Sequence, residues 1–428
     1  MLKNFLLGRE NTSIRDSYIW NLIASGVNAS EAIVVLMIAT RTVGIDDAGI
    51  LSIAFTIANL MMTIGKYGMR NFQVTDTINE FSFDDYFGSR ICTTVIMVLS
   101  TIIYLFSCMF FGNYSWYKAA IIFCVILIYA VESFEDVYVS ELQHRQRLDI
   151  GAKIFSVRWM GTLIVWGVGL ILLKETLISS VIALLFDIIL LAWLLHIVME
   201  SFDELSISKR RYRWDRVKQL LLSCFSLFAS GFLAYYITNA SKYAIDICLN
   251  DEVQACYGFV SMPIFVIGLL NTIIYQPILV KMSIEWNEGE IHLFVKRLIK
   301  QVIIIVVISL VCILGAWLFG IPVLSLLYAT DLTEYKFELI VLLIGGMWLA
   351  FAGFFNSVIT IMRKQRILLY VYIIVAILAL LLSNKMVIVY GVHGASVANM
   401  IWTLIESIIF GLVVVFNVKK ERKNVYEV

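Results

Sequence analysis

The sequence is poor in charged residues, with only 15% Asp, Glu, Lys or Arg among its 428 residues. A soluble fold of this size needs more polar surface than that, so a soluble globular protein is excluded. Hydrophobic residues make up 61% of the chain, and its mean hydropathy is +0.88. The composition is that of a membrane protein. The net charge of +1 does not indicate a nucleic-acid partner.

Signatures of catalysis and of metal binding are also missing. The seven cysteines show no CxxC spacing, and none of the four histidines has a suitably spaced partner. We find no HExxH, GxSxG or P-loop motif. The longest loop expected on the outer face runs only from Gly320 to Lys336. These absences argue against an enzyme, and we expect no cofactor.

Apolar runs of about 20 residues, each bounded by charged or turn residues, recur throughout the chain. They predict an all-α, polytopic membrane protein with twelve transmembrane helices. The predicted spans are 18–41, 48–69, 86–111, 117–140, 150–173, 177–199, 218–248, 255–280, 299–319, 337–361, 367–384 and 392–417.

The distribution of Lys and Arg predicts the orientation of these spans. Of the 33 basic residues, 25 lie in the two terminal segments and in or at the edges of the loops after even-numbered spans, whereas five lie in or beside the other loops and three lie within spans. Cytoplasmic loops carry the excess of Lys and Arg, so both termini are expected in the cytoplasm.

The most basic loop, Glu200 to Arg216, separates two sets of six spans. We expect an N-terminal lobe at residues 1–205 and a C-terminal lobe at 206–428. The arginine cluster of the loop either anchors it at the cytoplasmic face or holds anionic lipid headgroups. Short similarities such as IASG (Ile23 to Gly26) and FASG (Phe228 to Gly231) suggest a repeat. A repeat of six spans is parallel, which predicts a central cleft between the lobes.

Glu31 lies deep inside the first span, where a charged side chain needs a partner, a proton or a function. Asn28 is three residues earlier and Asn21 about two further turns back, so the three side chains can share one helix face. The sequence leaves two interpretations open: a polar stripe that packs helices together, or the lining of a cavity.

The seventh span carries a second polar group. Asn239, Lys242 and Asp246 share one face by their spacing. Lys242 and Asp246 either form an ion pair near the outer end of the helix, or Lys242 is held over a cleft where an anionic substrate competes with Asp246.

The other charged residues within the spans allow simpler predictions. Glu132 and Arg158 lie at similar depth, which predicts a structural salt bridge between the fourth and fifth spans. Lys66 lies near the inner end of the second span and can snorkel to the interface. Asp187 and Glu406 lie near the middle of the membrane, and either can carry a proton.

Several motifs resemble those of polysaccharide-exporting flippases, which belong to the multidrug/oligosaccharidyl-lipid/polysaccharide (MOP) exporter superfamily. The signature resembled is R-x-x-G, then (Y/A)-G, a long span and x-Y-G-x-x-x. Here it reads Arg41-Thr-Val-Gly44, then Asp47-Ala-Gly49, and then Gly65-Lys-Tyr-Gly68. Weaker similarities extend over most of the chain.

The resemblance implies two six-helix lobes in a MATE-like, V-shaped arrangement with a cleft lined chiefly by spans 1, 2, 7 and 8. It implies a flippase in the bacterial cytoplasmic (inner) membrane that translocates undecaprenyl-diphosphate-linked oligosaccharide by alternating access. Members acting on peptidoglycan precursor are expected to carry several arginines in the cleft. The few basic residues here favour the branch that exports O-antigen or capsular repeat units.

On this interpretation a few polar residues bind substrate and a few acids couple transport to H⁺ or Na⁺. The expected partners are the lipid-linked oligosaccharide, membrane lipids and other polysaccharide assembly proteins. The candidate substrate-binding residues are Lys242, Lys66, Arg41, Asn28 and Asn239. The candidate ion-coupling residues are Glu31, Asp246 and Asp187.

Two alternatives remain open. A cation-coupled small-molecule (multidrug) antiporter of the same fold would rely on acids such as Glu31 and Asp187 rather than on bases. A membrane-embedded glycan polymerase or ligase would be favoured by a long periplasmic loop, which the sequence lacks.

Overall fold

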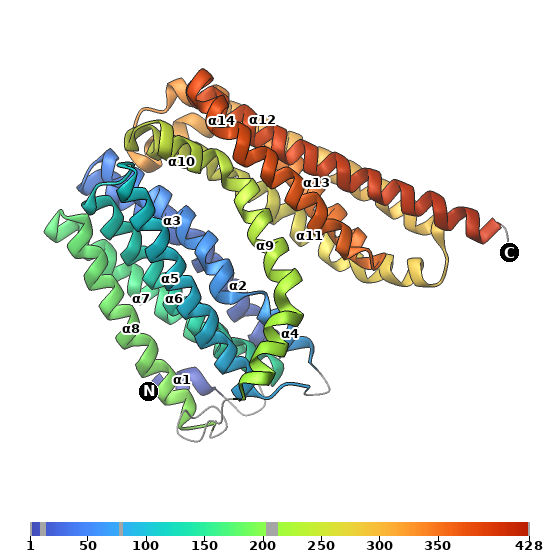
Figure 1. Ribbon diagram of the computed structural model, residues 1–428, viewed down its shortest axis with the longest axis horizontal. Helices are drawn as coiled ribbons and strands as arrows, with labels where there is room; N and C mark the ends of the chain where they lie inside the picture. The colour runs from blue at the N-terminus through green and yellow to red at the C-terminus, as the bar shows by residue number, and fades with distance from the viewer. Residues whose placement is uncertain (1, 9–13, 77–79, 203–212, 427–428) are drawn as a thin grey trace. The chain divides into compact units, whose positions relative to one another are not determined.

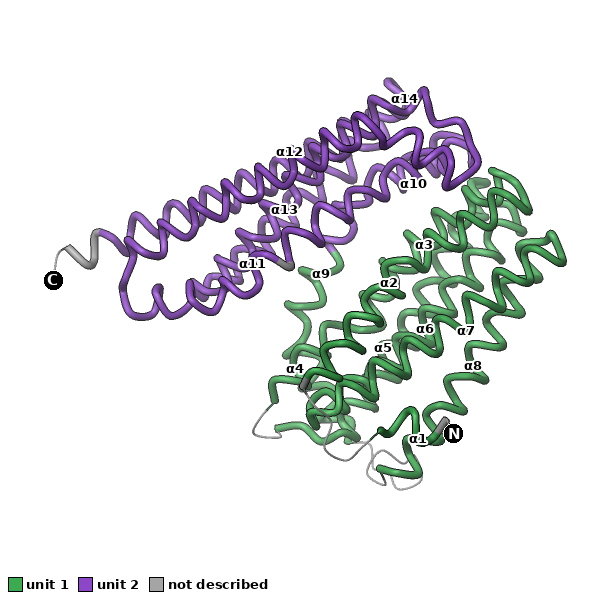
Figure 2. Tube along the Cα trace, turned by 180° about the vertical axis from the view of Figure 1, so that it is seen from behind, with its two compact units in different colours: residues 1–232 green, residues 233–428 purple. Residues whose placement is uncertain are grey.

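The computed structural model describes residues 2–8, 14–76, 80–202 and 213–426, and these residues are overwhelmingly helical (Figure 1). Their contacts divide the chain into two compact units, residues 1–232 and 233–428 (Figure 2). The border lies within one long helix. The lobe border expected at 205/206 falls in the segment 203–212, which lies outside the described residues, as does most of the arginine cluster of that loop.

The N-terminal unit is a bundle of long helices that run side by side (Figures 1 and 2). Its helices are α1 (Leu2–Leu7), α2 (Ile14–Thr42), α3 (Ile45–Lys66), α4 (Met69–Thr75), α5 (Phe83–Phe110), α6 (Trp116–His144), α7 (Leu148–Leu173), α8 (Thr176–Met199) and the first part of α9 (Trp214–Cys248). Helix α6 contacts α3, α4, α5, α7 and α8. This central position buries the polar side chains that α6 carries.

Local signals explain the helix boundaries around α6. The side chain of Ser115 accepts a hydrogen bond from the backbone amide of Lys118 at the start of α6. Ser82 and Asp85 form a capping box at the start of α5. Between α3 and α4, Tyr67 and Gly68 both adopt left-handed backbone conformations, with φ of 51° and 67°, and so turn the chain.

The C-terminal unit is built around α13 (Lys336–Ile361), which contacts α10, α11, α12 and α14. The other helices are the second part of α9, α10 (Asp251–Ser261), α11 (Pro263–Asn287), α12 (Ile291–Tyr328), a 3₁₀ turn at Thr333–Tyr335 and α14 (Gln365–Tyr426). Pro263 begins α11 directly after α10, so the eighth predicted span is divided there. Gly391, with φ 59° and ψ −137°, breaks the helical geometry within α14.

Ten helical segments in the described part of the chain are long and apolar enough to cross a membrane. The segment from 365 to 422 contains two predicted spans, one on each side of Gly391. The remaining predicted span corresponds to α6, which is not among the ten and carries several buried acids. The twelve predicted spans therefore all correspond to observed helices, and the all-α prediction is confirmed.

Candidate functional site

The most unusual feature of the N-terminal unit is the acidic face of α6. Glu132, Glu135 and Asp136 are each at most 5% exposed. Their i, i+3 and i+4 spacing places them on one side of the helix. Buried charges require oppositely charged partners and hydrogen bonds, and the neighbouring helices supply both.

Arg158 of α7 is fully buried and bridges α6 to α8. Its Nε lies 2.6 Å from Glu135 Oε2, and its Nη1 lies 2.8 Å from Asp187 Oδ1. The expected partner Glu132 is farther away, with Oε2 3.7 Å from Nη2 of Arg158. Thr162 donates a further hydrogen bond to Asp187 at 2.7 Å. Asp187, a candidate coupling acid, is therefore held in an ion pair.

Glu132 links this arginine to the end of α3. Lys66 Nζ lies 2.6 Å from Glu132 Oε1, and the indole of Trp159 donates to Glu132 Oε2 at 2.8 Å. The side chain of Lys66 is 32% exposed, whereas that of Glu132 is 3% exposed. The ammonium of Lys66 is thus already engaged by a carboxylate.

Asp136 binds two arginines. Arg90 of α5, which is fully buried, lies 2.8 Å from Asp136, and Arg70 of α4 lies 3.3 Å from it. Arg90 also donates to the carbonyl of Gly65 at 2.7 Å, and Thr93 donates to the same carbonyl at 2.8 Å. The carbonyl of Gly65 thus accepts two hydrogen bonds at the point where α3, α5 and α6 come together.

Glu31 of α2 faces into this unit and is 6% exposed. The hydroxyl of Tyr129, on α6, donates a hydrogen bond to Glu31 Oε1. The amide of Asn59 donates in turn to the Tyr129 hydroxyl at 3.3 Å. Within the described residues, the second oxygen, Oε2, has no hydrogen-bond partner. Asn28 is exposed, so it does not share the buried face of Glu31 as expected from their spacing.

We call these groups the ionic cluster. In the described part of the chain it brings together five carboxyl groups and four bases, and one of the bases, Arg70, is 40% exposed at its side chain. When every group is ionised, the cluster has one negative charge in excess. Its members are Glu31, Glu132, Glu135, Asp136 and Asp187, with Lys66, Arg70, Arg90 and Arg158.

The polar group of the seventh predicted span lies on the part of α9 that belongs to the C-terminal unit. Asn239 and Asp246 are 8% and 6% exposed, and Lys242 is half-buried. No ion pair within 4 Å joins Lys242 to Asp246, or to any other carboxylate among the residues that the structure describes. Lys66 pairs with a carboxylate, whereas Lys242 does not pair with one in the described chain. Asn239 donates to the carbonyl of Tyr235, one turn earlier, at 3.1 Å.

Arg41 lies at the end of α2 and is exposed. One of its guanidinium nitrogens, Nη1, donates to the carbonyl of Met37 at 2.8 Å.

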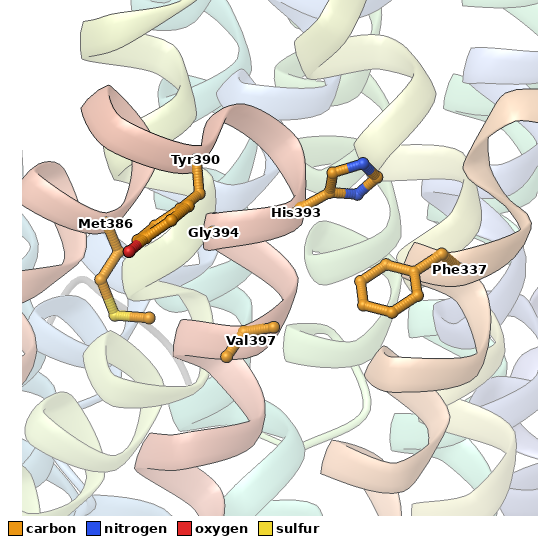
Figure 3. A pocket seen from close by; sticks show the side chains of 6 residues that line it. All are labelled: Phe337, Met386, Tyr390, His393, Gly394 and Val397. Carbon is orange, nitrogen blue, oxygen red and sulfur yellow. The ribbon is translucent and has the colours of Figure 1, made fainter.

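An apolar pocket of about 580 Å³ lies beside the break in α14 (Figure 3). Phe337, Met386, Tyr390 and Val397 line it together with His393, which pairs with Glu338 of α13. None of the residues expected to bind substrate lines this pocket. Across the described chain, no group of three or more His, Cys, Asp or Glu side chains is placed to hold a metal ion.

Sequence reasoning missed several members of the ionic cluster. Tyr129 looks like an ordinary core aromatic. The run Glu132 to Asp136 carries the clearer signal, because three acids on one face of an otherwise apolar helix require basic partners. Arg90 could be recognised in the same way, as a base placed within a predicted span.

Comparison with known proteins shows the fold. No family model matches the sequence, and no curated protein matches it. Among solved structures, a multidrug resistance MATE family transporter of the MOP superfamily, in an inward-facing conformation, is similar with a TM-score of 0.73 at 10% identity. The similarity covers 94% of this chain and 99% of that one.

The MATE transporter VcmN of Vibrio cholerae, in a bent form, is similar with a TM-score of 0.58 at 12% identity, covering 95% of this chain and 97% of that one. Identities this low show a shared fold rather than a shared substrate. The expected fold is thus confirmed: the chain has the fold of MATE family transporters of the MOP superfamily.

Proposed function

We propose that the protein is an ion-coupled flippase that moves a lipid-linked oligosaccharide across the bacterial cytoplasmic membrane by alternating access. The solved structures of this fold that match the chain are described as transporters, which supports transport as the general activity. The substrate is inferred from the sequence resemblance and from one basic residue of the C-terminal unit.

The substrate proposal rests on Lys242 and on its lack of a carboxylate partner among the described residues. A half-buried ammonium in a membrane-spanning helix, with no carboxylate within 4 Å in the described chain, retains its capacity to attract an anion. A diphosphate linkage is such an anion, and it cannot cross hydrocarbon unaided. A cation along the path lowers that barrier.

The other proposed substrate residues differ in how far their own contacts leave them available. Lys66 is held by Glu132, so its ammonium reaches an anion only at the expense of that ion pair. Asn28 and Arg41 are exposed and can hydrogen-bond to sugar or phosphate oxygens. Asn239 is more buried, and its side-chain carbonyl and second amide hydrogen are the groups that this bond to Tyr235 leaves for a sugar hydroxyl.

Coupling is assigned to Glu31. The ionic cluster has an excess carboxyl group, and Glu31 is the member with no basic side chain within 4 Å in the described structure. A proton that binds and leaves Glu31 changes the charge of the cluster without breaking an ion pair. Asp187 and Asp246 remain proposed coupling acids, but Glu31 is the first choice. Release of Asp187 would require breaking its contact with Arg158.

The substitution Lys242→Ala tests the substrate proposal. In a bacterial strain that lacks the gene, we expect lipid-linked repeat units to accumulate on the cytoplasmic side and surface polysaccharide to be lost. The wild-type gene restores export, whereas Lys242→Ala at equal expression restores tenfold less. Lys385→Ala, which removes an exposed lysine of the same unit, serves as the control and restores export fully. Unchanged surface polysaccharide in the deletion strain would refute the flippase.

A second candidate is a cation-coupled small-molecule antiporter. The similar solved structures favour it, because one of them is a multidrug resistance MATE family transporter. The two functions separate in the same deletion strain. Increased sensitivity to cationic dyes, with surface polysaccharide intact, would favour the antiporter over the flippase.

A further inference from the structure

The apolar pocket beside the break in α14 has no part in the proposed function. Its described lining residues belong to α14, apart from Phe337 at the start of α13. Figure 3 shows Phe337 on one side of the pocket and Met386 and Tyr390 on the other. All of them lie in segments that are long and apolar enough to cross a membrane. The volume of about 580 Å³ is typical of ligand sites, which range over about 300–1,000 Å³.

A reversal of the chain at Gly391 builds one wall of this pocket. The indole of Trp402 donates a hydrogen bond to the hydroxyl of Ser383 at 3.0 Å. These two residues lie on opposite sides of the break, so the second half of α14 folds back along the first. Gly394 lies so close to the first half that a Cβ there would be 2.1 Å from the carbonyl oxygen of Met386. The close packing at this turn holds the wall in place.

The surroundings of the pocket are those of a lipid-facing surface. Ile388 and Val389, on the same turns of α14, are 70% and 66% exposed, and Phe337 is 51% exposed. At the start of α13 the ammonium of Lys336 lies 4.9 Å from the ring centre of Trp317. Tryptophan and lysine side chains of this kind anchor membrane-spanning helices at the membrane–water interface. We therefore expect the pocket at the depth where the chains of a lipid meet its headgroup.

The lining of the pocket selects an apolar occupant. Phe337, Met386 and Val397 present aromatic, thioether and aliphatic surface. A buried water molecule typically makes about three hydrogen bonds, so ordered water does not fill such a hollow. If it were empty, its lining atoms would lose the dispersion contacts that packed atoms make. A hydrocarbon chain of the surrounding bilayer supplies those contacts without leaving an apolar phase.

Two polar side chains at the pocket favour a phospholipid over a wholly apolar molecule. Tyr390 and His393 both line the pocket, and their exposed fractions are 67% and 66%. His393 Nδ1 pairs with Glu338, which leaves Nε2 of the ring available. Among the described residues no hydrogen bond engages Nε2 or the hydroxyl of Tyr390. Both groups are suited to the phosphate and ester oxygens of a lipid headgroup.

We propose that this pocket is a binding site for one membrane phospholipid. One acyl chain of the lipid lies between Phe337, Met386 and Val397, and its headgroup lies beside Tyr390 and His393. The site lies wholly within the C-terminal unit. It is separate from the ionic cluster and from Lys242, and it does not depend on the identity of the transported substrate.

Native mass spectrometry of the purified, delipidated full-length protein tests this site. Palmitoyl-oleoyl phosphatidylethanolamine is titrated into the detergent solution. We expect the wild type to retain one lipid at an activation energy that removes lipids from the rest of the surface. Val397→Trp fills the pocket and should weaken this binding at least tenfold. Tyr390→Phe should weaken it about fivefold, as expected for the loss of one hydrogen bond.

Val389→Trp is the matched control, because it adds the same bulk to an exposed position of α14 that does not line the pocket. It should bind the lipid as the wild type does. If Val397→Trp does not fold, the wild type is irradiated with a phosphatidylethanolamine that carries a diazirine in its acyl chain. Peptides that contain Phe337 or residues 386–397 should then carry most of the label.

Three results would overturn the proposal. The first is a wild type that retains no lipid, or a Val397→Trp variant that retains it equally well. The second is labelling spread evenly over the lipid-facing helices. The third is retention of undecaprenyl phosphate in preference to phosphatidylethanolamine, since the pocket would then hold a polyprenyl chain rather than a phospholipid.

Discussion

The hydroxyl of Tyr129 donates a hydrogen bond to the carboxyl group of Glu31, and so joins α2 to α6 inside the N-terminal unit. This contact gives the one acid of the first span a polar neighbour without giving it a base. It also places Glu31 beside Glu132, because Tyr129 and Glu132 are one turn apart on α6. A change of charge at Glu31 is therefore felt by the ion pairs of the cluster.

Glu31→Gln should abolish ion-coupled transport while preserving the fold. Glutamine has nearly the same shape and still accepts the hydrogen bond from Tyr129, but it cannot bind and release a proton. We expect the variant to be at least tenfold less active in vesicles with an imposed pH gradient. Glu200→Gln, at an exposed position, is the control and should transport normally. Wild-type transport by Glu31→Gln would assign coupling to another residue.

Arg158→Met should destabilise the protein severely. Removing this buried guanidinium leaves Glu135 and Asp187 without their nearest base, and breaking one partner of a buried ion pair typically costs about 3–5 kcal/mol. Thermal unfolding of the purified protein measures the effect. Lys3→Met removes a surface ion pair with Glu200 and should cost no more than about 1 kcal/mol. Equal unfolding temperatures for the two variants would contradict the assigned role of Arg158.

Gly65→Ala should also destabilise the N-terminal unit, although alanine favours helices. A Cβ at this position would overlap Ser133 Oγ and lie 2.7 Å from Met97 Sδ, so α3 could no longer pack as closely on α5 and α6. We expect a loss of about 1–3 kcal/mol on unfolding. Gly26→Ala is the control, since nothing lies within 4 Å of its Cβ, and it should stabilise slightly. Ser133→Ala in the Gly65→Ala background should recover part of the loss.

Asp76, in the turn before α5, should make the stability of the protein toward unfolding depend on pH. Burial by itself raises the pKa of the Asp76 carboxyl. The hydrogen bonds from the amides of Phe81 and Glu80 and from the Tyr86 hydroxyl outweigh it and hold the pKa below its ordinary value. The stabilisation is therefore complete above the unfolded-state pKa of about 4 and is lost as the pH falls through the lower folded-state value.

Unfolding temperatures of the wild type and of Asp76→Asn, measured against pH, test this prediction. The difference between the two should be largest near neutral pH and should shrink in acid. Tyr86→Phe removes one of the three donors, so it should show the same trend with a smaller amplitude. A difference that does not change with pH would exclude a stabilising role for the ionised carboxylate.

Local patterns predicted much of the fold. Runs of apolar residues located every span, because a segment in hydrocarbon must satisfy its backbone hydrogen bonds internally and so forms a helix. The segment Gly65 to Gly68 was recognised as a motif, and the structure gives it a packing role, with Tyr67 and Gly68 in left-handed conformations. Pro263 likewise marks a helix boundary that could be anticipated from sequence.

Partners of buried charges could not be predicted in the same way. Spacing placed Asn28 and Glu31 on one face, but only Glu31 is buried, because the orientation of α2 about its axis is set by packing against its neighbours. Arg158 was expected to pair with Glu132, and it also holds Glu135 and Asp187 at shorter distances.

The amino-acid sequence alone determined the class of the protein and its helices, since hydropathy and backbone hydrogen bonding act within each segment. Tertiary structure decided which charges are neutralised. The spacing of Lys242 and Asp246 allows an ion pair within one helix and predicts none for Lys66, but packing brings Glu132 to within 2.6 Å of Lys66, while no carboxylate of the described chain comes within 4 Å of Lys242. Electrostatic pairing depends on distances between helices far apart in sequence, and only the packed fold fixes those distances.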